Sequence, residues 1–326
     1  MTEPSSPSAD PGGAGRGVSV VITNYNGRAL LERCLPAVET AAAAYGGPTE
    51  IILVDDCSTD GSREFVYEYF PKIDVFKPRQ NLGFQGASNL GFSKARFPVV
   101  LSLNNDVEVT PQSFAQLAAH FSRPDLFAVS AKLLQWDRTT YLAGRRIGVF
   151  EEGHLRLVDE PGDGSVSPTL FATGGAAAFD REKLLALGGF DPIFHPLYWE
   201  DIDLCYRAWK RGWRVIYDPN IVMYHKHRAT IETLVEPDRL QQITARNSYL
   251  FLWKNLSEGR ALRAHLWHAP ILLLRDALNR RWRFPLAFGR ALARLPAVWS
   301  ARLKEQRHWR RPDLSVLSEI SARRPS

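Results

Sequence analysis

Short apolar runs alternate with longer mixed segments through the first 120 residues of the chain. Runs such as VSVVIT and EIILVD are rich in β-branched residues, which is typical of strands buried on both faces of a parallel sheet. The segments between them have the apolar spacing and the capping residues of helices. The predicted strands are 18–23, 50–55, 73–76 and 99–103. The predicted helices are 28–45, one that runs to residue 69 with Asp60 or Ser62 as its cap, 86–95, and 110–121 with Thr110 as its cap.

The second half of the chain has a less regular pattern before it becomes helical. Residues 133–168 contain many glycines and charges, which predicts loops with short strands. Helices are predicted over 180–187, capped by Asp180, and over 201–211, and strands over 214–217 and 221–225. From Pro237 onward the pattern is helical. We therefore expect a disordered segment over 1–16, a main α/β domain over 17–236 and a helical region over 237–326.

The alternation of strands and helices predicts an α/β fold with a mostly parallel, doubly wound central sheet flanked by helices and followed by a C-terminal helical extension. In such sheets, ligands bind beyond the carboxyl ends of the strands. Polar residues stand at three of these ends: Asn24, then Asp55 with Asp56, then Asn104 to Asp106. These residues are therefore the first candidates for a binding site.

The chain of 326 residues carries a formal net charge of +6. This modest excess suits phosphate-bearing substrates or an anionic membrane surface, and it is too dispersed to indicate nucleic acid. No apolar stretch reaches the roughly 18 to 20 residues of a membrane span, and the N-terminus lacks the features of a secretory signal. The expected location is the cytoplasm, with a peripheral place at the inner face of the cell membrane as the alternative.

Two strand ends carry candidate chemistry. In LVDDCSTDGS, Asp55 or Asp56 would accept hydrogen bonds from a nucleobase or ribose, and the alternative is an Asx turn before the next helix. In LSLNNDVEV, the oxygens of Asn104, Asn105 and Asp106 suit a hard divalent ion such as Mg²⁺ or Mn²⁺, which would also bind diphosphate oxygens. The alternative for this second segment is a polar turn.

Glu200 and Asp201 in YWEDIDLCYRAW begin a predicted helix. The helix dipole by itself favours acids at this position. The functional interpretation is a general base, a carboxylate that removes the proton of an attacking hydroxyl. Both interpretations stay open from this segment alone.

Two other segments are less specific. His225 and His227 alternate on a predicted strand and so point to the same side, where one of them is a candidate metal ligand with Asp106 and the alternative is a structural pair. Gly174 and Gly175 lie in ATGGAAAF, where small residues allow close approach of the backbone to a ligand or tight packing inside the protein.

Taken in order, six segments resemble the family 2 glycosyltransferases with a GT-A fold, in particular the bacterial rhamnosyltransferase-like and galactofuranosyltransferase-like members. The matching segments are VSVVITNYNG, EIILVDDCSTDGS, RQNLGFQGASNLGF, VLSLNNDVEVTPQSF, TGGAAAFDREKLLALGGFDPIFHPLYWEDIDLCYRAWKRGWRV and VMYHKH. The resemblance implies an inverting enzyme that uses a dTDP- or UDP-sugar, with rhamnose favoured, together with Mg²⁺ or Mn²⁺.

The resemblance also implies roles for single residues. Asn104 and Asp106 occupy the family's DxD motif, and the Asn leaves metal affinity and metal identity open. Asp201 matches the catalytic base with Glu200 beside it, and His225 completes the metal site. The implied donor-binding residues are Thr23, Asn24, Asn26, Asp55, Asp56, Arg79, Asn81, Gly83, Asn89, Asn104 and Asn105, and the candidate acceptor-binding residues are Gly174, Gly175 and Trp199.

The QxxRW motif of processive synthases is absent from the sequence, which favours addition of one or a few sugars to a saccharide or lipid-linked acceptor. Two other functions stay open. One is a sugar nucleotidyltransferase, although TNYNG replaces its Gly-rich basic loop, and the other is an inactive homologue that binds nucleotide sugar. The basic, Trp-containing stretch 261–311 suits a membrane interface or, alternatively, a cap on the catalytic domain or on a second copy of the chain.

Overall fold

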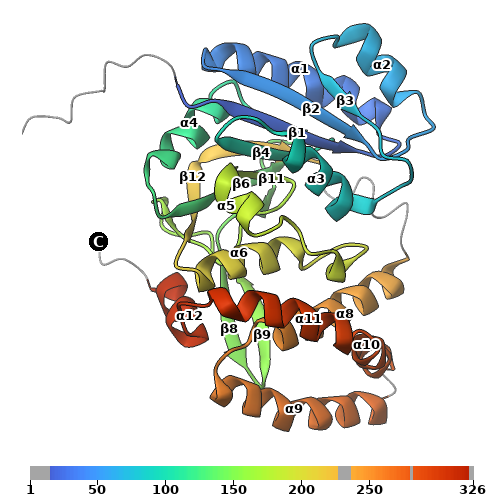
Figure 1. Cartoon of the computed structure of the whole chain (residues 1–326), viewed down its shortest axis with the longest axis vertical. Coiled ribbons are helices and arrows are strands. Elements are labelled where there is room, and N and C mark those ends of the chain that lie inside the picture. Colours follow the sequence, from blue (N-terminus) through green and yellow to red (C-terminus); the bar gives the residue numbers. More distant parts are fainter. Residues whose placement is uncertain (1–14, 227–235, 280–281, 323–326) are drawn as a thin grey trace, which may run out of the picture.

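A central sheet with helices on both faces forms the upper part of the molecule (Figure 1). The computed structural model describes residues 15–226, 236–279 and 282–322, so almost all of the segment 1–16 lies outside the described residues. The strands follow the order β10-β12-β6-β11-β4-β1-β2-β3. The predicted α/β class with a doubly wound sheet is confirmed.

The half of the sheet formed by the first strands is parallel, as predicted. It consists of β1 (Val18–Asn24), β2 (Thr49–Asp55), β3 (Asp74–Phe76) and β4 (Val99–Asn104). Val20 and Ile22 of β1 pack into one hydrophobic core, and Val21 packs into the core on the opposite face. Because both faces are covered, apolar residues dominate the interiors of these strands. Ser19, Glu50 and Ser102 are the buried polar residues among them before the carboxyl ends.

Helices from different parts of the chain cover the two faces. α1 (Arg28–Tyr45), α2 (Ser62–Tyr69) and α4 (Ser113–Ala119) pack on the core that contains Val20, and α3 (Gly83–Lys94), α5 (Arg181–Ala186) and α6 (Glu200–Lys210) pack on the core that contains Val21. The predicted cap of α5 is confirmed, since Asp180 accepts a hydrogen bond of 3.0 Å from Lys183 N.

Two predicted helix starts are wrong. α3 begins at Gly83 and not at Gly86. The helix placed from Thr110 begins at Ser113, and its last turn is the 3₁₀ segment His120–Ser122. The Thr110 amide and hydroxyl both bond the Ser113 hydroxyl, at 3.0 and 2.8 Å. Thr110 therefore lies in the turn before the helix. It bonds the side chain of Ser113 and does not cap the first amides of the helix.

The second half of the sheet differs most from the prediction. β6 (Leu126–Gln135) and β11 (Ala176–Asp180) were not predicted, and β12 (Arg214–His225) was divided into two strands. β11 runs antiparallel between β4 and β6, and β12 runs parallel to β6. The register of β12 shifts between Asp218 and Val222, where Pro219 has no N–H to donate. This bulge interrupts the apolar pattern of one continuous strand.

Short strands complete this region. They are β5 (Val107–Glu108), which pairs with β12, and β7 (Tyr141–Ala143), β8 (Arg146–Glu151), β9 (His154–Asp159) and β10 (Ser167–Pro168). The prediction of loops with short strands is confirmed from residue 136 onward, whereas residues 133–135 continue β6. The β8–β9 hairpin extends from the sheet toward the lower end of the molecule (Figure 1).

The predicted helical pattern after Pro237 is confirmed. Its helices are α8 (Pro237–Asn255), α9 (Gly259–Leu278), α10 (Arg283–Leu292), α11 (Leu295–Glu305) and α12 (Asp313–Ser321). Leu250 of α8 belongs to the same hydrophobic core as Leu204 of α6. A domain boundary at residue 236 stays a prediction. Among the described residues, every helix is too short or too polar to cross a membrane.

Buried charges join α6 to α8. Lys254 Nζ lies 2.6 Å from Asp191 Oδ2 and 2.8 Å from Asp203 Oδ2, and Arg207 Nε donates to the same Asp203 oxygen at 2.7 Å. Asp203, Arg207 and Lys254 are each at most 2 % exposed. Charges at this depth are tolerated only when they are paired. The position of α6 is therefore coupled to the C-terminal helices.

Candidate active site

Polar side chains from three chain segments meet at the carboxyl ends of β1 and β2. Asn24 Nδ2 donates to Asp55 Oδ1 at 3.0 Å and to Ser58 Oγ at 3.2 Å, and Asn24 Oδ1 accepts from Asn105 Nδ2 at 2.7 Å. Thr23 precedes this cluster on β1. Asn24 and Asp55 are directly opposite each other in the parallel register. The structure thus joins three residues that the sequence predicted for donor binding, Asn24, Asp55 and Asn105, and adds Ser58.

The two acids after β2 hold neighbouring loops. Asp55 is fully buried, and its Oδ2 accepts from Ser58 N at 3.2 Å, which is the local turn contact that the sequence left as the alternative. Asp56 accepts from Leu82 N at 2.7 Å and from Gly83 N at 2.8 Å. Burial raises the pKa of Asp56 above its ordinary value, against the effect of these two backbone hydrogen bonds. A contact of either acid with a nucleoside stays a prediction.

Three further donor-binding candidates have different surroundings. Asn81 bridges the loop, with Nδ2 donating to Asp56 O and Oδ1 accepting from Gly83 N. Arg79 is exposed and makes no ion pair with any described residue. Asn89 is occupied by the backbone of Phe190, to which it donates and from which it accepts at 2.8 Å each. Asn89 therefore fastens α3 to the segment before α6.

Asn26 lies in the loop that follows the carboxyl end of β1. It has a left-handed backbone with φ of 48°. Its Oδ1 accepts from Thr59 N at 2.8 Å, and its own N–H donates to Ser58 Oγ at 2.9 Å. The loops after β1 and β2 are thus joined through side-chain hydrogen bonds.

Asp106 and His225 are adjacent although 119 positions separate them in the sequence. His225 Nε2 lies 3.1 Å from Asp106 Oδ1, and His225 pairs with Val107 where β12 meets β5. Asp106 is 5 % exposed, and its buried Oδ1 has this contact with His225 but no well-aligned hydrogen bond. The second predicted histidine, His227, lies outside the described residues.

This pair fits a divalent cation. A buried carboxylate oxygen without a hydrogen bond is costly unless something compensates its charge. Neighbouring ligands of an octahedral ion with bonds of about 2.1 Å lie about 3.0 Å apart, close to the separation of the Asp106 and His225 atoms. In the part of the chain that the structure describes, no group of three or more His, Cys, Asp or Glu could hold a metal. Further ligands would therefore be substrate phosphates and water.

The two acids at the start of α6 are held differently. Asp201 Oδ1 accepts from Ile202 N at 2.8 Å, and its Oδ2 lies 3.3 Å from Gly174 N, which donates to it. Glu200 Oε2 accepts from the buried Gln85 Nε2 at 3.2 Å. Burial raises the pKa of both carboxyl groups, and the charge of Asp201 raises that of Glu200 further. The backbone therefore orients Asp201, whereas a side chain engages Glu200.

The glycines beside Asp201 are required by close contacts. A Cβ on Gly174 would lie 3.0 Å from the Phe190 ring, and a Cβ on Gly175 would lie 2.3 Å from the Asn104 side chain. Asn104 N also donates to Gly175 O at 2.8 Å. Gly174 and Gly175 thus connect the end of β4, where the metal candidates begin, to the carboxylate of Asp201.

Trp199 was predicted to contact the acceptor. Its side chain is 6 % exposed and packs on Phe251 of α8, with ring centroids 5.2 Å apart. Its backbone is left-handed, with φ of 77°, which turns the chain into α6. The contact with an acceptor stays a prediction.

Sequence reasoning missed residues that position this segment. Asn247 is fully buried, and its Nδ2 donates to Phe194 O, Leu197 O and Tyr198 O at 2.8 to 3.0 Å. Arg246 Nη2 donates to His195 O at 2.5 Å. The role of this Arg-Asn pair depends on contacts across about 50 positions, which leave no local signal in the sequence.

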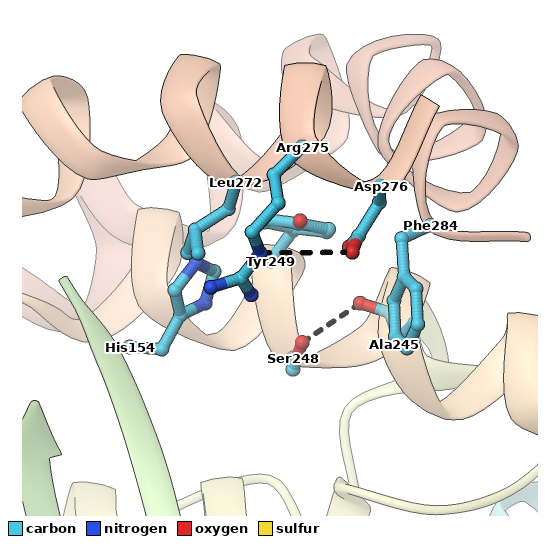
Figure 2. Close-up of a pocket in the computed structure, with 8 residues that line it drawn as sticks. All are labelled: His154, Ala245, Ser248, Tyr249, Leu272, Arg275, Asp276 and Phe284. Carbon is cyan, nitrogen blue, oxygen red and sulfur yellow. Dashed lines mark hydrogen bonds and ion pairs between the residues drawn. The ribbon is translucent and has the colours of Figure 1, made fainter. Parts of the chain in front are cut away.

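A cavity of about 310 Å³ lies away from all of the predicted site residues. Figure 2 shows it between α8, α9, α10 and β9. Its lining residues are His154, Ala245, Ser248, Tyr249, Leu272, Arg275, Asp276 and Phe284. None of them takes part in the contacts described above, so the candidate site rests on the strand ends and on the start of α6.

Comparison with known proteins gives a family match over part of the chain. Residues 19–188, more than half of the chain, match the family described as "Glycosyl transferase family 2". This stretch includes Asp55 and Asp106, and it ends before Asp201 and His225.

Two relatives and one solved structure are informative. The chain is 26 % identical over 313 residues to the N-acetylglucosaminyl-diphospho-decaprenol L-rhamnosyltransferase of Mycobacterium tuberculosis, with 83 % of this chain and 98 % of the relative covered. It is 34 % identical over 250 residues to an uncharacterized glycosyltransferase of Nostoc sp., with 75 % and 70 % covered. A mannosyltransferase from Pyrobaculum calidifontis in complex with GDP-Man and Mn²⁺ superposes with a TM-score of 0.55 at 21 % identity, covering 90 % of this chain and 79 % of that one. The likeness to this structure is one of fold, and with the family match it leads to one conclusion: this chain belongs to glycosyltransferase family 2 and has the GT-A fold.

Proposed function

We propose that this glycosyltransferase transfers one sugar with inversion from a dTDP- or UDP-sugar, with rhamnose favoured, to a hydroxyl of a saccharide or lipid-linked acceptor in cell-surface polysaccharide synthesis. The observation that carries the proposal is the Asp201 carboxylate, oriented by two backbone N–H groups at the start of α6. The name of the mycobacterial relative, a rhamnosyltransferase acting on a diphospho-decaprenol acceptor, supports the choice of rhamnose and of a lipid-linked acceptor.

Asp201 is proposed as the general base. A carboxylate whose pKa is raised by burial is better matched to removing a proton near neutral pH than an ordinary aspartate. A single displacement needs this base and no enzyme nucleophile, whereas retention needs a second carboxylate that attacks the sugar. Glu200 is buried and engaged by Gln85, so we give it a supporting role beside Asp201.

Asp106 and His225 are proposed as the protein ligands of Mg²⁺ or Mn²⁺. A divalent ion bound there supplies positive charge that stabilises the leaving diphosphate. The Mn²⁺ in the mannosyltransferase complex supports this choice. Asn104 stands in the first position of the DxD-like segment and is kept beside Gly175, so we assign it to the donor diphosphate instead of the ion.

The remaining residues are proposed to bind the donor nucleotide. Arg79 is the cation of the set, and its guanidinium is exposed and unpaired with any described residue, so it is assigned to the diphosphate. The cluster around Asn24 and Asp55 would face the nucleoside. Most of these side chains form hydrogen bonds within the protein. We therefore propose that they orient the loops, whose backbone groups would contact the ligand.

Replacing Asp106 by alanine is expected to weaken Mn²⁺ binding measured with nucleoside diphosphate present by at least about tenfold, the lower end of what losing a supporting residue of a metal site costs. Calorimetric titration of Mn²⁺ measures this without turnover. Glu108→Gln is the matched control, because Glu108 lies two residues away and already pairs with Arg33 and Arg138 at 3.0 and 2.6 Å. Equal Mn²⁺ affinities for Asp106→Ala and the unchanged protein would remove Asp106 from the metal site.

The function is tested by incubating the protein with Mg²⁺ or Mn²⁺, a panel of dTDP- and UDP-sugars and a lipid-linked N-acetylglucosaminyl diphosphate. Release of nucleoside diphosphate, with product of opposite anomeric configuration to the donor, is the expected result. Release of pyrophosphate would indicate a nucleotidyltransferase instead. Binding of donors without turnover would indicate an inactive homologue.

A further inference from the structure

α9 exposes several large apolar residues to solvent, whereas its buried residues are small or polar. Trp267, Ile271, Leu274 and Leu278 follow each other at spacings of four, three and four residues, and are 72, 52, 61 and 76 % exposed. The face that packs on the protein carries Ala261, His265, Ala269 and Asp276. A helix that only caps a domain has the opposite arrangement.

Buried hydrogen bonds fix this orientation of α9. His265 is 1 % exposed; its Nε2 lies 2.9 Å from Trp253 Nε1, which donates to it, and its Nδ1 lies 2.8 Å from Gly153 O. Gly153, in the turn of the β8–β9 hairpin, would clash with the backbone of His265 if it carried a Cβ, at 2.6 Å. Rotation of α9 to bury Trp267 would break both hydrogen bonds, so the outward apolar face is built into the fold.

Basic residues extend the same face. Arg260 and Arg263 are exposed and lie seven and four residues before Trp267, on the same side of the helix. We call the surface formed by these two arginines with Trp267, Ile271, Leu274 and Leu278 the α9 outer face.

The charge of the chain is divided between its two parts. Residues 237–326 contain 18 Lys and Arg against 6 Asp and Glu, a formal net charge of +12, whereas residues 1–236 contain 23 against 29, a net charge of −6. The modest net charge of the whole chain is therefore the sum of a strongly basic C-terminal region and an acidic remainder. Such a region attracts an anionic surface and repels a second copy of itself.

The α9 outer face lies at the end of the molecule. In Figure 1, α9 is the lowest element, at the opposite end from α1 and α2, and the β8–β9 hairpin meets it from above. Contacts of the hairpin with His265 are on the inner face, so the outer face points away from the catalytic part. Trp282, 58 % exposed, follows the end of α9.

We propose that the α9 outer face docks flat on an anionic phospholipid bilayer. Trp, Leu and Ile would enter the boundary between headgroups and acyl chains, and the arginines would bind lipid phosphates, as in helices that lie in the membrane interface. The helix is not apolar enough to span the bilayer, so it lies on its surface. A lipid-linked acceptor would be reached from this position, but the docking surface does not depend on which sugar the enzyme transfers.

The full-length protein is tested by sedimentation with vesicles of phosphatidylcholine, with and without phosphatidylglycerol. We expect binding to the vesicles that contain phosphatidylglycerol, and less binding as salt is added. The double substitution Trp267→Ser, Leu274→Ser is expected to weaken binding by about tenfold or more, because burial of one such side chain is already worth about a factor of ten. Arg260→Glu, Arg263→Glu should abolish the preference for the anionic lipid.

Tyr67→Ser, Tyr69→Ser is the matched control, because both tyrosines are 60 % exposed on α2, away from α9. This control should bind vesicles like the unchanged protein. Equal vesicle binding by the Trp267→Ser, Leu274→Ser protein, or none by the unchanged protein, would overturn the proposal. Conversion of a dimer to a monomer by the same substitutions, without vesicle binding, would show that the face contacts a second copy of the chain.

Discussion

Replacement of Asp201 by asparagine is expected to lower turnover by about 10²- to 10⁴-fold, the usual contribution of a general base. Asparagine has nearly the same shape and can still accept the hydrogen bond from Ile202 N, so α6 should keep its start. The residues proposed to bind the donor nucleotide are other than Asp201, so donor affinity should stay within about twofold of the unchanged protein. Steady-state kinetics together with calorimetric titration of nucleoside diphosphate separate the two quantities.

Asp74→Asn is the control for this substitution, because Asp74 is an exposed aspartate whose only close cation among the described residues, Arg96 Nη2, is 3.9 Å away. Its turnover should equal that of the unchanged protein. If Asp201→Asn lowers nucleotide affinity and turnover by the same factor, the carboxylate binds the donor and is not the base.

The pH dependence follows from the same group. Burial raises the pKa of Asp201 above the usual 3.8, and a base acts only when it is deprotonated. kcat/KM should therefore increase as the pH rises through this raised pKa, and it should be low at pH values below that pKa. The measurement is a pH profile of kcat/KM with saturating metal; an acid limb at the pKa of an ordinary aspartate would contradict the assignment.

Replacement of Lys254 by methionine is expected to lower the free energy of unfolding by about 3–5 kcal/mol, the usual result when one partner of a buried ion pair is removed. Methionine matches the length of the lysine stem but leaves Asp191 unpaired and Asp203 with Arg207 alone. Both acids lie on the segment that carries Asp201. We therefore also expect lower activity than in the unchanged protein at temperatures below its melting temperature. Urea denaturation followed by circular dichroism gives the free energy.

Lys72→Met is the matched control, because Lys72 is exposed and has no ion pair with a described residue. It should change the free energy of unfolding by less than about 0.5 kcal/mol. A loss of under about 1 kcal/mol for Lys254→Met would mean that the buried charges contribute little to holding α6.

The parallel half of the sheet could be predicted because its information is local. β1, β2 and β4 are buried on both faces, so each is an apolar run that ends at a polar residue, and their parallel order brings Asn24, Asp55 and Asn104 to one edge. The antiparallel half could not be predicted in the same way. β11 is a strand of small residues that resembles a loop, and the bulge of β12 at Pro219 divides one strand into two.

The sequence by itself determined which residue types are available for chemistry and where buried strands end, because burial on both faces leaves a pattern in neighbouring residues. Only the tertiary structure decided which of them meet. Asp106 finds His225, Asn89 is taken up by Phe190, and Lys254 neutralises Asp191 and Asp203, all across 50 to 120 positions of chain. The orientation of α9 was decided in the same way. Its amphipathic pattern marks an apolar face, but the hydrogen bonds of His265 with Trp253 and Gly153 turn that face outward, because the free energy of a helix depends on what its two faces contact.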